Sequence, residues 1–220
     1  MKRYERAVIL TAAVMLAATM ASAVPSQTET VNCIVAVVNK KIITLTDVKL
    51  VEAFGFFETK AIPDARERRR FLLDKLIDQK VVIDIAWEKA PVDQAKVEDE
   101  LNQLLARLGR DEAKRRIEEF GLEAADLKPF LEEKVLGEMI IASRFGRSTG
   151  VTLREIETYY AETYAPGQKK LGQDPKPLIE VLKTIEAEIK KNKVETQVAH
   201  WIKNLRQQAE IEVRPDCLNK

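Results

Sequence analysis

The fold is decided by the stretch from Leu178 to Val213, which reads LIEVLKTIEAEIKKNKVETQVAHWIKNLRQQAEIEV. Apolar residues recur in it at steps of three and four, which is typical of an amphipathic helix with one buried face. One step, from Ile189 to Val194, is longer and predicts a kink or break near Asn192. The apolar positions are Leu178, Leu182, Ile185, Ile189, Val194, Val198, Trp201, Leu205 and Ala209.

The end of this stretch predicts a strand. From Glu210 to Val213 an alternating pattern replaces the helical period, and Pro215 ends the element. A single strand needs a partner, and the strongest strand signal elsewhere is the β-branched run Ile34–Val38. We therefore expect the two ends of the chain to meet in a small sheet beside the long terminal helix.

The composition favours helices. Of the 220 residues, 45% are hydrophobic and 32% are charged, whereas 6% are aromatic and there are only 8 Gly and 8 Pro. We expect a mainly α fold with a small β-sheet, formed by an N-terminal hairpin and the C-terminal strand. The net charge of +1 gives no electrostatic argument for binding nucleic acid.

The first 23 residues have the pattern of an export signal. A basic start with Lys2, Arg3 and Arg6 precedes an apolar run and the small residues Ala21-Ser-Ala23. The alternative is an uncleaved membrane anchor, but the apolar run is short for a bilayer, which needs about 20 residues. We expect cleavage after Ala23, no stable membrane insertion afterwards, and a mature protein in the periplasm.

The two cysteines, Cys33 and Cys217, flank the two strand segments expected to pair. In an oxidising compartment such a pair is first considered as a disulfide. Two unpaired thiols at frayed ends are the alternative. Neither cysteine has the spacing of a CxxC motif or of a metal site, and we expect no cofactor.

Capping residues, glycines and prolines divide the rest of the chain. Residues 33–44 predict a hairpin that turns at Asn39, and Thr46 is expected to cap the helix that follows. Three prolines and two glycines in residues 165–177 predict a linker without helix. The expected helices are at about residues 46–54, 64–90, 93–109, 111–120, 127–145 and 152–164.

The order of these elements resembles that of the SurA family of periplasmic chaperones and peptidyl-prolyl isomerases. The resemblance covers about residues 31–213. It implies a SurA N-terminal-like helical domain over 31–164 and a C-terminal helix and strand, 178–213, that return to it. The motifs that carry it are Val35-Ala-Val-Val-Asn39, Ile43-Thr-Leu-Thr-Asp-Val48, Leu73-Asp-Lys-Leu-Ile-Asp-Gln-Lys-Val-Val82, Glu138-Met-Ile-Ile141, Val151–Tyr160 and Trp201–Val213.

The chain departs from that family in one respect. The slot in which the family carries parvulin-type isomerase domains holds only residues 165–177. Parvulin sites are built around histidines, and this chain has one, His200, which we interpret as a surface or interface residue. No phosphate-binding loop, HExxH or GxSxG motif is present either. The resemblance therefore implies the chaperone half without an enzyme.

A chaperone of this kind needs exposed apolar surface to hold unfolded clients, such as outer-membrane protein precursors, without ATP. The alternative is a helical adaptor that binds one folded partner or forms a homodimer through the terminal helix. The client-binding candidates are the aromatics least explained by a helical stripe, and internal packing is the alternative role for each. They are Phe54, Phe56, Phe57, Tyr159, Tyr160 and Tyr164.

Overall fold

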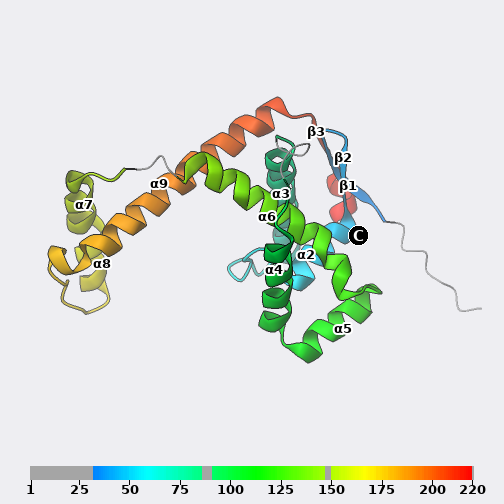
Figure 1. Ribbon diagram of the computed structural model, residues 1–220, viewed down its shortest axis with the longest axis horizontal. Helices are drawn as coiled ribbons and strands as arrows, with labels where there is room; N and C mark the ends of the chain where they lie inside the picture. The colour runs from blue at the N-terminus through cyan, green and yellow to red at the C-terminus, as the bar shows by residue number, and fades with distance from the viewer. Residues whose placement is uncertain (1–31, 86–90, 147–149, 220) are drawn as a thin grey trace, which may run out of the picture. The chain divides into compact units, whose positions relative to one another are not determined.

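The computed structural model describes residues 32–85, 91–146 and 150–219 (Figure 1). The expected signal peptide, residues 1–23, lies outside this part, and so do residues 86–90 at the end of the helix expected at 64–90. The elements are β1 (Ile34–Val38), β2 (Lys41–Thr44), α2 (Leu45–Phe54), α3 (Ala65–Ile83), α4 (Gln94–Leu108), α5 (Arg110–Phe120), the 3₁₀ turn η1 (Ala124–Leu127), α6 (Lys128–Phe145), α7 (Leu153–Tyr159), the π turn η2 (Tyr160–Tyr164), α8 (Ala165–Lys170), α9 (Leu178–Gln208), β3 (Ile211–Val213) and the 3₁₀ turn η3 (Pro215–Asn219).

The described chain is mainly α with one small antiparallel sheet, which confirms the expected fold class. The strand order is β2-β1-β3, so β1 pairs with its hairpin neighbour on one side and with the last strand of the chain on the other. The alternating pattern at residues 210–213 was thus the signal of a real strand. Its partner is the β-branched run predicted from the sequence.

The hairpin turns at Asn39 and Lys40, which have positive φ values of 47° and 70°. Two residues with positive φ suit the right-handed twist of a two-residue hairpin, and Asn tolerates this conformation well. Asn39 also binds the end of α9, since its N–H donates to Glu210 O (2.9 Å) and its Oδ1 accepts from Glu210 N–H (2.8 Å). One turn therefore fixes both the hairpin and the start of β3.

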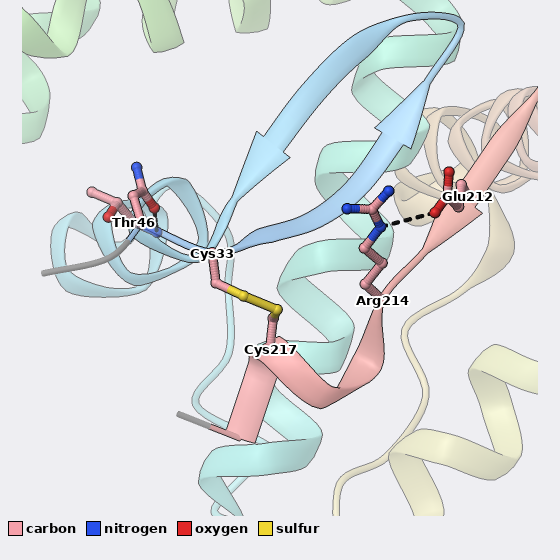
Figure 2. Close-up of a disulfide and its surroundings, with 6 residues drawn as sticks. Cys33, Thr46, Glu212, Arg214 and Cys217 are labelled. Atoms are coloured by element: carbon pink, nitrogen blue, oxygen red, sulfur yellow. Dashed lines mark hydrogen bonds and ion pairs between the residues drawn. A yellow bond between two sulfur atoms is a disulfide. The ribbon is translucent and has the colours of Figure 1, made fainter.

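A disulfide joins Cys33, just before β1, to Cys217 in η3 (Figure 2). The Cα atoms lie 5.8 Å apart, within the range that a disulfide spans. On the same turn, Leu218 is 5% exposed and belongs to the core beneath the sheet. The last residues of the chain are thus held by a covalent bond, a strand and an apolar anchor.

Three expectations about the helices were wrong in detail. Thr44, not Thr46, caps α2, because its hydroxyl and N–H form a reciprocal capping box with Asp47. Helix α9 runs from Leu178 to Gln208 without a break at Asn192, because one irregular step in an apolar stripe removes no backbone hydrogen bond.

The third correction concerns the expected linker, of which residues 165–170 are helical. The π turn η2 continues α7 into α8, and Ala165 N–H bonds to Tyr160 O. Pro166 falls in the first turn of α8, where a residue without an N–H donor is tolerated. Gly172, with φ of 71°, follows the end of this helix, and residues 171–177 match the predicted linker without helix.

The buried side chains form three groups. The first joins the sheet to α2, α3 and η3, and the second joins α2 to α4 and α6. The third is smaller and joins α7 to the first half of α9 through Ile156, Val181, Ile185 and Ile189. The first half of α9 therefore has a core of its own, whereas its second half faces α3 and α6.

Candidate functional site

Phe54 lies in the core and offers no surface to a client. Its side chain is 1% exposed, and its ring lies 6.1 Å from that of Phe120. The structure therefore contradicts its assignment to a client groove. The reason is its position at the end of α2, on the face that covers α4 and α5, where the left-handed Gly55 turns the chain away.

Phe56 and Phe57 are half-buried rather than free in a loop. The ring of Phe56 meets the ring of Phe130 edge-on at 6.1 Å, and both phenylalanines pack against the core under the sheet. An edge-to-face pair of this kind contributes to packing. Much of their apolar area is thus used inside the protein.

The three tyrosines pack on the third core group. The rings of Tyr160 and Tyr164 stack at 5.5 Å, and the Tyr160 hydroxyl donates to Lys176 O at 2.8 Å. Tyr159 lines two shallow hollows next to Ile189. These contacts hold α7 and η2 to α9, so the tyrosines have a structural role here.

His200 is exposed on α9, and its Nδ1 lies 3.3 Å from Asn204 Nδ2, one turn on. Its neighbour Trp201 points elsewhere and meets the Phe145 ring at 5.5 Å, with the Arg144 guanidinium 5.0 Å above the indole. Trp201 therefore secures α9 to the end of α6. Asn204, the hydrogen-bond partner of His200, is not the carboxylate that typically orients a general base.

The best candidate site is a groove of about 660 Å³ between α3, α6 and the second half of α9. Its apolar surface comes from Ile141 of α6 and from one face of α9. Val194, Val198 and Ile202 recur at steps of four, and Ala199 lies three residues before Ile202, so the four residues form one strip along the helix.

The strip is apolar but incompletely covered. In the first half of α9, Val181, Ile185 and Ile189 are buried, whereas no residue beyond Ile189 in this helix is buried. Val194 and Val198 are half-buried and Ala199 is exposed. Apolar surface that the chain itself leaves uncovered is the physical requirement for holding another polypeptide.

Charged side chains rim the groove. Arg206 on α9 donates to Asp78 (2.9 Å) and Asp74 (3.0 Å) on α3, and these bonds close one end. Burial raises the pKa of Asp78 above its ordinary value, and the neighbouring Arg206 offsets only part of that effect. The remaining charged rim residues are Lys75, Glu195 and Lys203.

The sequence contained the signal for this groove, but our interpretation assigned it to the core. Val194 and Val198 belong to the predicted stripe, and nothing in the stripe itself distinguishes its covered half from its open half. That difference arises because α7 and η2 pack on the first half of α9 through the third core group. Of the six aromatic candidates, Phe54 is buried and the other five are half-buried.

The described residues contain neither a metal-binding cluster nor a membrane-spanning helix. In these residues no three His, Cys, Asp or Glu side chains gather where a metal ion could bind. No helix within 32–85, 91–146 and 150–219 is long and apolar enough to cross a bilayer. Comparison of the sequence with known protein families and with curated proteins gives no match.

Proposed function

We propose that this protein is a periplasmic, ATP-independent holdase that binds unfolded polypeptides, outer-membrane protein precursors among them, in the groove between α3, α6 and α9. The observation that carries the proposal is the half-open apolar strip of Val194, Val198 and Ala199. An apolar strip with a charged rim fits the mixed side chains of an unfolded chain, and it needs no nucleotide.

Features of the sequence support the proposed cellular location. The basic start, apolar run and small-residue site in residues 1–23 have the form of an export signal. A disulfide between Cys33 and Cys217 agrees with an oxidising compartment. The resemblance of the element order to the SurA N-terminal domain supports the same location and a role in holding clients. No catalysis is included in the proposal.

The test is suppression of the aggregation of an unfolded outer-membrane protein diluted from urea. Ala199→Glu places a charge in the groove at an exposed position, so folding should be unaffected. Ala187→Glu is the matched control, because Ala187 is exposed on the same helix and lies outside the groove. We expect Ala199→Glu to lose suppression and Ala187→Glu to keep it, with equal helical content.

Val198→Asp gives an independent check, since Val198 also lines the groove. Suppression that is unchanged in both Ala199→Glu and Val198→Asp would remove the groove as the client site. A wild-type chain that leaves aggregation unaffected, but binds a single folded protein, would favour the adaptor function instead.

A further inference from the structure

The outer edge of β2 carries no further strand in the part of the chain that the structure describes. In the order β2-β1-β3 the central strand is β1, and among the described strands β2 pairs with β1 alone. Figure 2 shows β3 along one side of β1 and β2 along the other. An open strand edge presents backbone N–H and C=O groups to which an extended chain can bond.

The hairpin register identifies the groups at this edge. Across the two-residue turn, Val38 and Lys41 face each other as a hydrogen-bonded pair, and in an antiparallel ladder such pairs alternate with non-bonded ones. The N–H and C=O of Ile42 therefore point away from β1. The next outward N–H, that of Thr44, donates to the Asp47 carboxylate at 2.8 Å and closes the open stretch.

A cavity of about 200 Å³ lies beside this edge. Its apolar walls are Ile42 and Ile43 of β2, Leu76 of α3, and Pro129 and Phe130 of α6. Side chains of a strand alternate between the two faces of a sheet. A strand laid along β2 would therefore direct every second side chain to the face of the buried Ile43 and this cavity. The others would lie beside Ile42, which is 52% exposed.

Charge restricts what can enter the cavity. Its charged lining consists of Asp47, Lys80 and Glu133. Lys80 Nζ lies 2.5 Å from Glu133 Oε1, so these two charges offset each other. The carboxylate of Asp47 then leaves the lining with one net negative charge. An acidic side chain would be repelled there. An apolar side chain with a basic neighbour matches both the walls and the net negative charge.

We propose that the β2 edge and this cavity bind an extended segment of a client by strand addition. The segment has alternating apolar residues and basic rather than acidic flanks. At about 3.3 Å per residue the four residues of β2 accommodate a segment of about four residues. This inference rests on the proposed holdase function, and it assigns to the client a second contact that is separate from the helical groove.

The experiment uses a labelled peptide of alternating Val and Thr with Lys at both ends, and the mature full-length chain. Binding is measured by fluorescence anisotropy. Two further peptides are N-methylated, one on the Val positions and the other on the Thr positions. Strand addition uses one alternate set of N–H groups, so one methylated peptide should bind roughly tenfold more weakly and the other nearly as well as the parent.

A variant of the protein provides a second test of strand addition. Ile42→Pro removes the outward N–H, and proline is tolerated on an edge strand. We expect roughly tenfold weaker peptide binding with an unchanged melting temperature. Ile42→Thr keeps the N–H and is the matched control. A peptide with Glu in place of both Lys residues should bind more weakly than the parent, and equal binding would contradict the charge argument.

If both methylated peptides lose binding affinity equally, or neither loses any, strand addition is overturned. A concentration-dependent dimer that Ile42→Pro abolishes would assign the edge to a second copy of the chain and overturn the client proposal. The holdase proposal is tested apart from this one. If the wild type suppresses aggregation but shows no asymmetry between the methylated peptides, the edge proposal alone fails. If asymmetric binding occurs without suppression, the edge binds peptides and the holdase function fails.

Discussion

The guanidinium of Arg206 lies 2.9 Å from the Asp78 carboxylate and so ties the second half of α9 to the middle of α3. We expect Arg206→Ala to lower the free energy of unfolding by about 1–2 kcal/mol, since it removes bonds to two carboxylates that are only partly shielded from solvent. Urea denaturation measures this loss. Lys203→Ala, on the same helix and also at the groove, is the control and should change stability little.

Asp78 should make stability depend on pH in the opposite sense to an ordinary ion-paired carboxylate. Burial raises the pKa of Asp78 in the folded chain. The contribution of this group to stability is therefore highest below its unfolded pKa of about 3.9, and it falls as pH rises through the higher folded pKa. Asp78→Asn should gain stability relative to the wild type across that window. A difference that is constant between pH 3 and pH 7 would contradict this.

Glu155 makes stability depend on pH in the sense that is usual for an ion-paired carboxylate. Lys193 Nζ lies 2.6 Å from the Glu155 carboxylate, and Thr152 N–H donates to it at 2.9 Å, so its pKa falls from 4.5 to about 2. The stability that it provides is present above about pH 4.5 and is lost as pH falls toward 2.

An NMR titration of the Glu155 carboxyl carbon tests this value. Its midpoint should lie near 2 in the wild type and should rise in Lys193→Ala. Lys191→Ala is the control, because the nearest carboxylate to Lys191 is that of Glu195 at 4.0 Å. A wild-type midpoint near 4.5 would show that the α7–α9 ion pair does not form.

Phe56→Ser should destabilise the fold rather than act on client binding alone. The half-buried ring meets Phe130, and truncation of a fully buried Phe costs about 3–5 kcal/mol, so about 2 kcal/mol is expected here. Thermal denaturation alongside the aggregation assay separates the two effects. An unchanged melting temperature with lost suppression would return Phe56 to the client site.

The chain should show no prolyl-isomerase activity. Its one histidine, His200, is exposed on α9 and bonds to Asn204. A proline-limited peptide assay, with a parvulin-type enzyme as positive control, should give the uncatalysed rate. Catalysis that His200→Ala abolishes would show that an isomerase site exists.

The sequence predicted most of the fold because its signals were local. Caps such as Asp93 and Thr152, the glycines that end helices, and the alternation at residues 210–213 each act within a few residues. The helix at 165–170 was missed because a π turn is set by packing against α9, and no short motif marks it. Thr46 was taken as the cap of α2 although Thr44 is the cap, because both threonines precede an apolar run and the sequence alone does not distinguish them.

The candidate site was harder to predict, because exposure depends on what the rest of the chain leaves uncovered. Phe54 and Val198 illustrate this. Phe54 was a candidate because no helical stripe explained it, although its place at a helix end favoured internal packing, and it is buried against Phe120 of α5. Val198 belongs to an apolar stripe, which suggested a core position, and it is half-open. Which half of a long helix is covered is a property of the whole fold.

The position of β3 has a consequence for how the chain matures. Synthesis proceeds from the N-terminus, so β1 exists long before residues 211–213, its second partner, have been made. Pairing over so long a sequence separation is slow to form. Until then the central strand of the finished sheet is an edge strand, and Leu218 has not yet covered the core beneath it. While it is being made, a protein of this architecture would itself need protection from aggregation.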